Sequence, residues 1–330
     1  MCGIVGFTGC TQAAPVLLDG LRRLEYRGYD SAGVAVFDGE RIEMVKASGS
    51  VEHLAELTDG GAKLRGTSGI AHTRWATHGA PTDTNAHPHL SENGRFAVIH
   101  NGIVENFAAL RAELEGEGYV FASETDTEVV AHLLEKYYDG DLKRTVMRTA
   151  SRLEGSYVLG VLCADEPGRL FCVKEAGPLI LGLGVGENYF ASDVTALVSR
   201  TKNVIYMDDG EFAELTPEHI TVFDRTGREI TKTVSHVVWD IEAAEKGGYD
   251  HFMMKEICEQ PKAVRDTIAP RIRNGRVVLD DITLTAEQLR NFTKICIVAC
   301  GTAYHVGVVA KYAFEELLRI PVEVDVASEF

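Results

Sequence analysis

Short apolar runs alternate with polar segments along most of the chain and divide it into predicted strands and amphipathic helices. Residues 2–9 form an apolar run that ends in glycine, which predicts a first strand. Within residues 13–28, apolar side chains recur with the spacing of a helix. Residues 31–49 carry two apolar runs around Asp38-Gly39, which is the pattern of a β-hairpin.

The same alternation continues to about residue 240. The predicted helices are residues 51–59, 105–118 and 125–139, and the predicted strands lie within 66–77, 94–106, 155–165, 169–184 and 188–198. Many strands joined by turns and interleaved with pairs of helices favour stacked layers of sheet and helix, which is an α+β fold.

The pattern changes near residue 240, where a Gly-Gly pair among charged residues predicts a linker. Residues 294–330 then predict a strand, a tight turn, a helix and a second strand, which together make one βαβ unit. One such unit cannot bury both of its faces, so we expect this second domain to be incomplete. The predicted divisions are a first domain at 1–240, a linker at 241–251 and a second domain at 252–330.

Charge and composition exclude several classes of protein. The 330 residues carry a formal net charge of −16, from 33 Lys and Arg against 49 Asp and Glu. Such acidity argues against a nucleic acid or an anionic membrane as the main partner. No apolar run approaches the ~20 residues that a membrane span needs, and residues 1–20 lack the pattern of a signal peptide. We therefore expect a cytoplasmic protein.

The cysteines and histidines do not follow metal-binding patterns. The seven cysteines include no CxxC pair, which argues against a zinc site or a disulfide framework and fits a reducing cytoplasm. Five histidines lie between residues 72 and 100, but their spacing matches no metal motif. We expect neither a metal nor a cofactor.

The cysteine at position 2 has two interpretations. The first is a structural thiol at the start of a strand, since cysteine is among the most buried residue types. The second is that Met1 is removed and Cys2 becomes the N-terminal residue, with an α-amine of ordinary pKa about 7.7–8.0 beside its thiol. That amine would act as the base that activates a nucleophile. Gly3 would then leave room for a substrate to approach.

Two polar stretches carry side chains suited to a small substrate, and each also has a structural interpretation. Arg27 and Gly28 end the first predicted helix, where Gly28 is expected as its C-cap. Arg74, Trp75 and His78 share one loop. A planar guanidinium suits two-pronged binding of a carboxylate, and the tryptophan would exclude water. The alternative is a surface loop with a packed tryptophan.

Two further polar positions complete the candidate site. Asn101-Gly102 often marks a turn, but an Asn amide and a Gly N–H can also form an oxyanion hole for acyl transfer. Asp126 lies at the start of a predicted helix, either as its N-cap or as the partner of a substrate ammonium group. Together with an N-terminal thiol and Arg74, these groups are the parts needed to hydrolyse a free amino-acid side-chain amide, with glutamine as the natural candidate.

The chain resembles the glutaminase domain of the glutamine–fructose-6-phosphate aminotransferases in the motifs MCGIVG, LEYRGYDSAG, HTRWATHG, HPH, HNGIVEN and ETDTE. That family belongs to the N-terminal-nucleophile hydrolases, so the resemblance implies a four-layer αββα sandwich. It also implies Cys2 as the nucleophile after removal of Met1, Asn101 and Gly102 as the oxyanion hole, and Arg27 near the nucleophile. The residues that it implies around glutamine are Arg74, Trp75, Thr77, His78 and Asp126, with the tryptophan at the gate of an ammonia channel.

The later motifs HFMMKEICEQP and CGTAYHVG resemble the start of an SIS sugar-phosphate isomerase domain. The resemblance implies that Gly301 and Thr302 bind a sugar phosphate at a helix N-terminus. Ala303 stands where the family often has serine, so one hydroxyl contact is absent. For a full-length protein the resemblance implies conversion of fructose 6-phosphate and glutamine into glucosamine 6-phosphate and glutamate, and we expect a homodimer.

Two other functions stay open on the sequence. One is another cysteine-type amidotransferase, of a purine or asparagine pathway, although such enzymes attach phosphoribosyl-transfer or ATP-using domains in place of residues 294–330. The other is a non-catalytic protein that binds sugar phosphates through an SIS fragment. It would not need Cys2, Arg74, Asn101 and Asp126 together.

Overall fold

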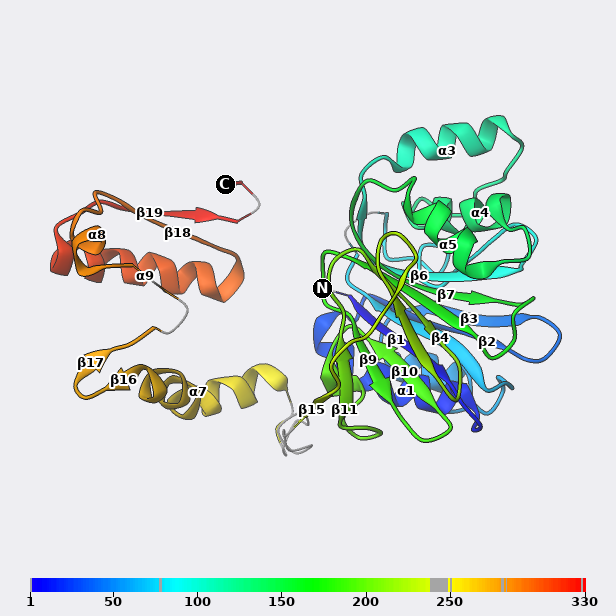
Figure 1. The fold of residues 1–330 in the computed structure, drawn as a ribbon, viewed down its shortest axis with the longest axis horizontal. Helices are drawn as coiled ribbons and strands as arrows, with labels where there is room; N and C mark the ends of the chain where they lie inside the picture. Colours follow the sequence, from blue (N-terminus) through cyan, green and yellow to red (C-terminus); the bar gives the residue numbers. More distant parts are fainter. Residues whose placement is uncertain are drawn as a thin grey trace. The chain divides into compact units, whose positions relative to one another are not determined.

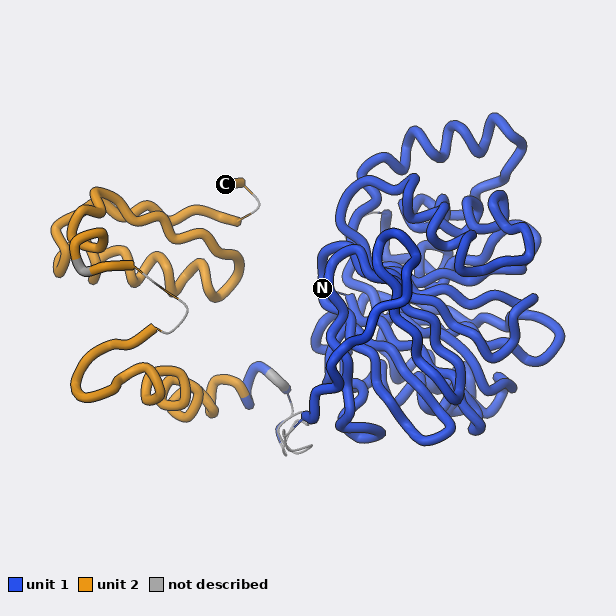
Figure 2. The backbone as a smooth tube through the Cα atoms, viewed as in Figure 1, with its two compact units in different colours: residues 1–255 blue, residues 256–330 orange. Residues whose placement is uncertain are grey.

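A computed structural model of the chain describes residues 2–76, 79–237, 249, 251–279, 282, 284–327 and 329–330. The chain divides into two compact units, residues 1–255 and 256–330 (Figure 2). The boundary between these units falls inside helix α7 (Phe252–Ile268). The predicted linker at 241–251 lies almost entirely outside the described residues, and the predicted domain boundaries stay predictions.

Two antiparallel sheets lie face to face in the first unit (Figure 1). The first sheet has the order β15-β11-β9-β10-β1-β4-β2-β3, with strands β1 (Gly3–Thr8), β2 (Ser31–Phe37), β3 (Ile42–Ser48), β4 (Ser68–Arg74), β9 (Ile180–Leu183), β10 (Asn188–Ala191), β11 (Asn203–Tyr206) and β15 (Ser235–His236). The second has the order β14-β13-β12-β8-β7-β6-β5, with strands β5 (His89–Leu90), β6 (Phe96–Val104), β7 (Gly155–Cys163), β8 (Leu170–Glu175), β12 (Glu211–Leu215), β13 (Ile220–Phe223) and β14 (Glu229–Ile230).

Helices cover the outer face of each sheet. The first sheet is covered by α1 (Ala13–Leu24) and α2 (Val51–Leu57), with short 3₁₀ turns at η1 (Glu25–Arg27) and η2 (Val194–Ala196). The second is covered by α4 (Glu128–Tyr137) and α5 (Leu142–Ala150), with α3 (Phe107–Gly116) packed on α4 (Figure 1). These layers confirm the predicted four-layer αββα sandwich.

The alternation of side chains along β1 explains where Cys2 points. Ile4 lies in the apolar core between the two sheets, whereas Val5 lies in the core beneath α1. Because successive strand residues face opposite sides, Cys2 continues the row of Ile4 and lies at the end of the space between the sheets.

Strand β6 brings Asn101 to the same place from the opposite sheet. Ala97 and Ile99 contribute to the core between the sheets, and Val98 packs in the core beneath the helices of the second sheet. Asn101 follows Ile99 in the inward-facing row, so strand periodicity directs it toward Cys2.

The second unit contains the predicted βαβ arrangement. Strands β18 (Ile295–Ala299) and β19 (Val322–Val326) pair in parallel and are joined by α9 (Gly301–Leu318). A Cβ atom on Gly307 would lie 2.8 Å from Ile297, so this glycine allows close packing of α9 on the strands. The remaining elements are η3 (Ala269–Arg271), β16 (Ile272–Arg273), β17 (Arg276–Val277) and α8 (Ala286–Arg290). Throughout the described part of the chain, no helix has the length and apolarity to cross a bilayer.

Candidate active site

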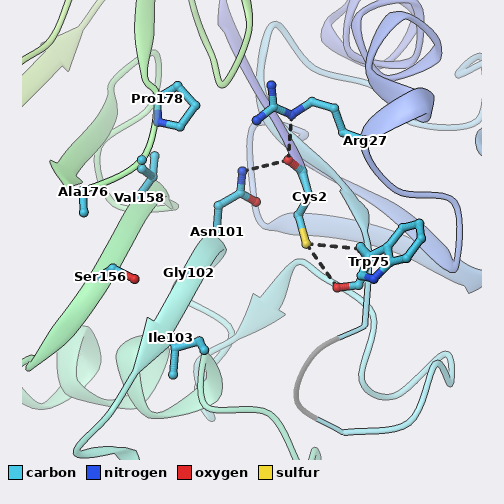
Figure 3. A pocket seen from close by; sticks show the side chains of 11 residues that line it. Cys2, Arg27, Trp75, Asn101, Gly102, Ile103, Ser156, Val158, Ala176 and Pro178 are labelled. Carbon is cyan, nitrogen blue, oxygen red and sulfur yellow. Dashed lines mark hydrogen bonds between the residues drawn. The ribbon is translucent and has the colours of Figure 1, made fainter. Parts of the chain in front are cut away.

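A pocket of about 350 Å³ opens at the end of the sandwich where Cys2 and Asn101 meet (Figure 3). Its polar residues are Cys2, Arg27, Asn101 and Ser156, and it is also lined by Gly102 and Trp75. Ile103, Val158, Ala176, Gly177 and Pro178 complete its lining. The structure thus gathers five of the predicted site residues around one cavity.

Two side chains hold the backbone of Cys2 in place. Asn101 Nδ2 donates to the Cys2 carbonyl oxygen at 3.0 Å, and Arg27 Nε donates to the same oxygen at 3.3 Å (Figure 3). The guanidinium of Arg27 is itself fixed by an ion pair with Asp193 at 3.0 Å. Arg27 therefore positions the residue that carries the thiol.

The thiol of Cys2 is held by the backbone of Trp75. The Trp75 N–H donates to Sγ at 3.2 Å, and Sγ lies 3.5 Å from the Trp75 carbonyl oxygen. Burial raises the pKa of the Cys2 thiol above its ordinary value, and the Trp75 N–H opposes part of this effect. The group is consequently a thiol at neutral pH and needs a base before it can attack a carbonyl.

Gly102 has a conformation and a position that suit glycine alone. Its φ is +128°, and a Cβ atom would lie 2.0 Å from the carbonyl oxygen of Ser156. Backbone geometry thus restricts position 102 to glycine, and strand periodicity places Asn101 beside it at the pocket.

Two other glycines near the site are required by close packing. A Cβ atom on Gly3 would lie 2.7 Å from Thr73 and 2.8 Å from Leu24, so its small size serves the packing of β1. Gly28 is the C-cap of η1, as predicted, with an extended φ of −177° and its backbone N–H donating to the Glu25 carbonyl oxygen at 3.1 Å. It is small because a Cβ atom would lie 2.7 Å from the backbone of Arg74.

Arg74 ends β4 and is buried outside the lining of the Cys2 pocket. Its NH1 and NH2 groups donate to the carbonyl oxygens of Ala80 at 3.3 Å and Gly79 at 3.2 Å. Burial lowers the pKa of Arg74, while the nearby Cys2 and Asp126 raise it. The other two predicted glutamine contacts of this loop, Thr77 and His78, lie outside the described residues.

Asp126 does not cap the helix that follows it. Helix α4 begins at Glu128, and its N-cap is Thr127, which makes no side-chain capping hydrogen bond. Asp126 Oδ2 instead accepts from the backbone N–H of Val104 at 2.8 Å, just beyond Gly102 on β6. The N-cap interpretation is therefore wrong, and Asp126 joins its loop to β6, the strand that carries Asn101 and Gly102.

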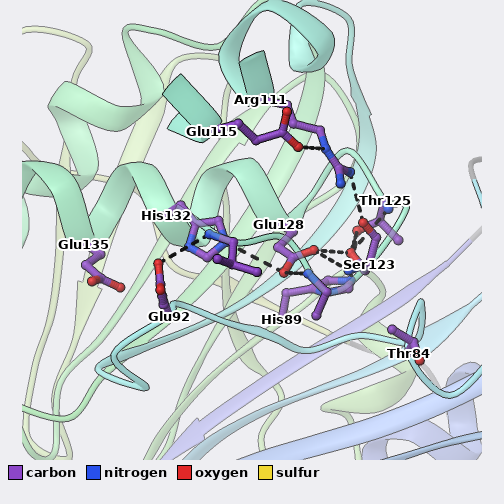
Figure 4. A network of polar contacts seen from close by, with 12 residues as sticks. Thr84, His89, Glu92, Arg111, Glu115, Ser123, Thr125, Glu128, His132 and Glu135 are labelled. Atoms are coloured by element: carbon purple, nitrogen blue, oxygen red, sulfur yellow. Dashed lines mark hydrogen bonds and ion pairs between the residues drawn. The ribbon is translucent and has the colours of Figure 1, made fainter. Parts of the chain in front are cut away.

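A polar network that the sequence did not reveal supports the loop of Asp126 (Figure 4). Glu128 accepts hydrogen bonds from the N–H groups of Ala122 and Ser123 and from the Ser123 hydroxyl, at 2.6–2.8 Å. The Ser123 hydroxyl contacts that of Thr125 at 3.0 Å, and Thr125 contacts His89 Nε2 at 3.1 Å. Burial would raise the pKa of Glu128, but the hydrogen bonds outweigh it and hold the pKa below its ordinary value.

The clustered histidines are buried rather than arranged as metal ligands. His72, His87, His89 and His100 are all at least 95% buried, and burial lowers the pKa of each. Among the described residues, no group of three or more His, Cys, Asp or Glu side chains has an arrangement that could hold a metal ion.

The predicted phosphate-binding residues lie in the second unit. Gly301 has φ +57° and begins α9, with Thr302 in its first turn. Both residues are exposed. They lie at the N-terminus of α9, directly after β18, which is the place predicted.

Family comparisons match both parts of the chain. Residues 72–199 match the model of a glutamine amidotransferase domain, and residues 288–330 match that of an SIS domain. The isomerising glutamine–fructose-6-phosphate aminotransferase of Caldanaerobacter subterraneus subsp. tengcongensis is 55% identical over all of this chain and 54% of its own length. The corresponding protein of Clostridium tetani is 51% identical over the same shares. The chain thus spans about half the length of these curated relatives.

Among solved structures, the chain is similar to the glutamine phosphoribosylpyrophosphate amidotransferase of B. subtilis complexed with ADP and GMP. The TM-score is 0.62, with 22% identity over 98% of this chain and 65% of that chain. This likeness concerns the fold, which is that of an N-terminal-nucleophile amidotransferase.

Proposed function

This chain is a homologue of the isomerising glutamine–fructose-6-phosphate aminotransferases, and from that relationship we propose that its first unit hydrolyses glutamine to glutamate and ammonia. The observation that carries the proposal is the convergence of the Cys2 thiol, the Asn101 amide and Gly102 on one pocket (Figure 3). A nucleophile and two oxyanion donors are the groups that acyl transfer requires.

The first half of the reaction forms a thioester. After removal of Met1, the α-amine of Cys2 takes the thiol proton, and sulfur attacks the side-chain amide carbon of glutamine. The amide oxygen gains negative charge, which Asn101 Nδ2 and the Gly102 N–H stabilise. One hydrogen of Nδ2 is directed to the Cys2 carbonyl, and the second serves the substrate. The protonated amine then gives its proton to the departing nitrogen, and ammonia leaves.

The second half of the reaction releases glutamate. Water attacks the thioester carbon, the α-amine takes a proton from this water, and the thiol of Cys2 is restored. The same oxyanion donors act again, because the second tetrahedral intermediate forms at the same carbon.

Four residues would bind the amino-acid part of glutamine. Arg74 would bind its α-carboxylate and Asp126 its ammonium group, with Thr77 and His78 as further contacts. Trp75, which lines the pocket and is 45% exposed, would lie at the gate through which ammonia leaves.

For the whole protein we propose synthesis of glucosamine 6-phosphate from fructose 6-phosphate, with Gly301 and Thr302 in its sugar-phosphate site and a homodimer as its assembly. The match of residues 288–330 to an SIS domain supports this over a purine-pathway amidotransferase. The identity of 55% to an aminotransferase, against 22% to the phosphoribosylpyrophosphate amidotransferase, supports the same choice.

The proposal is tested by following glutamate release from glutamine, with intact mass establishing that Met1 is absent. We expect the unaltered chain to release glutamate and Cys2→Ala to release none. Cys10→Ala is the matched control, because Cys10 is exposed, does not line the pocket, and contacts the Gly186 carbonyl. Glutamate release that persists in Cys2→Ala would overturn the assignment of the nucleophile.

A further inference from the structure

The amide of Asn101 has an orientation that a neighbouring histidine determines. His72 lies on β4, in the sheet opposite to Asn101, and its ring is fully buried. His72 Nε2 is 3.0 Å from the His100 carbonyl oxygen and 3.0 Å from Asn101 Oδ1. A backbone carbonyl only accepts hydrogen bonds, so Nε2 must carry the ring proton. Oδ1 of Asn101 therefore faces His72, and its NH₂ group faces Cys2.

The reverse orientation of this amide would break both contacts. The NH₂ group of Asn101 would then face the N–H of His72, and its oxygen would face the carbonyl oxygen of Cys2. Two donors would be opposed on one side and two acceptors on the other, and buried groups without partners are costly. The ring proton of His72 thus selects the orientation in which Asn101 offers donors to the pocket.

The surroundings of His72 keep this ring neutral and in place. Burial lowers the pKa of His72 to about 3, so the ring carries one proton throughout the neutral range. Its ring stacks on that of His87, with centroids 4.3 Å apart and planes inclined by 23°. His87 Nδ1 in turn accepts from the backbone N–H of His100 at 3.3 Å. The carbonyl of His100 is the second partner of His72, so one residue of β6 orders both rings.

We propose that His72 is a positioning residue for amide hydrolysis, which fixes the Asn101 side chain with its N–H donors toward the reacting carbonyl at Cys2. This inference rests on the proposed function. His72 does not line the pocket, and it reaches the pocket through its contact with Asn101. Its contribution falls on the tetrahedral intermediate, where the oxyanion forms, rather than on binding of the amino-acid part of glutamine.

Two amide substitutions of His72 separate this role from a purely structural one. The amide nitrogen of glutamine corresponds in reach to Nε2 of histidine, whereas that of asparagine corresponds to Nδ1. His72→Gln can therefore still donate to Asn101, and His72→Asn is the matched variant that cannot reach it. We expect His72→Asn to lower kcat by at least about tenfold with KM within about threefold, and His72→Gln to retain most of the rate.

Inhibitor binding gives a second measurement. The aldehyde analogue of glutamine, glutamate γ-semialdehyde, adds to the thiol and forms a tetrahedral adduct that uses the oxyanion donors. Glutamate itself does not need them. His72→Asn should weaken binding of the aldehyde at least about tenfold and leave glutamate binding nearly unchanged. An equal loss of affinity for the aldehyde and for glutamate, or a wild-type kcat in His72→Asn, would overturn the proposal.

A measurement independent of activity tests the orientation itself. In the ¹⁵N-labelled chain, the ring nitrogens of His72 should show the neutral form with its proton on Nε2 between pH 5 and 9. A proton on Nδ1, or a charged ring, would overturn the inference whether or not the chain hydrolyses glutamine. Absence of glutamate release by the unaltered chain, with the expected ring form present, would instead overturn the proposed function.

Discussion

The backbone of Gly102 approaches the carbonyl oxygen of Ser156 so closely that a Cβ atom at residue 102 would lie 2.0 Å from it. The same residue has φ +128°, which side chains rarely allow. Both constraints act on the N–H that would stabilise the oxyanion.

Gly102→Ala should therefore displace this N–H and lower kcat for glutamine hydrolysis by about 10²-fold, the effect of losing one oxyanion donor. Gly116→Ala is the control, because Gly116 ends α3 and a Cβ atom there would meet nothing within 4 Å. Steady-state kinetics of both variants test this. Wild-type kcat in Gly102→Ala would show that the backbone at this position does not take part.

Arg74→Lys should weaken glutamine binding although the charge is kept. The guanidinium donates through separate nitrogens to Gly79 and Ala80, and a single ammonium group cannot reproduce this planar geometry. A weakened charge-assisted contact costs about 1.5–3 kcal/mol, which corresponds to a KM higher by about 10- to 150-fold. The exposed Arg65 provides the control substitution Arg65→Lys. An unchanged KM in Arg74→Lys would assign Arg74 a structural role.

Sequence periodicity predicted a strand or helix well where the order of apolar and polar residues within that one element is sufficient to identify it. The hairpin at Asp38-Gly39 is an example, since β2 and β3 pair on either side of that turn. The inward direction of Cys2 and Asn101 also follows from alternation along β1 and β6. The stacking of two sheets between helix layers was specified by the family resemblance rather than by alternation.

The relationships that sequence could not supply are those between elements far apart in the chain. Nothing in the pattern around His72 indicates that its ring meets Asn101 across the two sheets. Asp126 is a residue type that often caps helices, but in the fold the backbone N–H of Val104 comes close and donates to its carboxylate. The C-cap position of Gly28 could be predicted from sequence, but the close approach of the Arg74 backbone, which leaves no room for a Cβ atom, could not. Periodicity reports the face of a residue and not what packs against that face.

An electrophilic glutamine analogue should label Cys2 alone among the seven cysteines. Cys163 and Cys172 are fully buried, and burial raises the pKa of Cys163 to about 11 and that of Cys172 further. The exposed cysteines, Cys10, Cys258, Cys296 and Cys300, do not line the pocket in which the analogue would bind. Peptide mapping after labelling tests this, and label found mainly on Cys300 would contradict it.

The reactivity of Cys2 toward iodoacetamide should depend on pH and on the N-terminus. Burial raises the thiol pKa, so in a chain that retains Met1 the thiolate fraction stays small at neutral pH. Alkylation should then become fast only above the ordinary thiol pKa. With Met1 removed, the free α-amine should shift the rise in rate toward about pH 7.7–8.0. Identical pH profiles for the two forms would show that the amine does not activate the thiol.

Glu128→Gln should lower the free energy of unfolding at pH 7 by about 1.5–3 kcal/mol, the contribution of hydrogen bonds to a buried charged group. The glutamine NH₂ group would face N–H donors of Ala122 and Ser123 (Figure 4). Since the folded pKa of Glu128 lies below its ordinary value of 4.5, its contribution is present above that pH and declines as pH falls below it.

Urea unfolding of the wild type and Glu128→Gln at pH 7 and pH 3 measures this difference. The difference between their free energies of unfolding should be smaller at pH 3 than at pH 7. Glu56→Gln provides the control, because the Glu56 side chain is 75% exposed and should contribute little at either pH. An equal difference in the free energy of unfolding at both pH values would show that the charge of Glu128 is not what stabilises the loop.

The 330-residue chain should release glutamate from glutamine without forming an amino sugar. Isomerisation of a sugar phosphate needs a base that moves a proton between adjacent carbons. The candidate bases in the second unit are His305, in the first turns of α9, and Glu329, after β19, and both are exposed to solvent. The chain spans 54% of its relatives' length, so we expect the isomerising groups in the remainder. Ammonia should therefore escape to solvent.

Incubation of the chain with glutamine and fructose 6-phosphate, followed by assays for glutamate and amino sugar, tests this prediction. The full-length relative from Caldanaerobacter is the positive control. Amino sugar formed in step with glutamate would show that residues 1–330 carry the complete synthetic site.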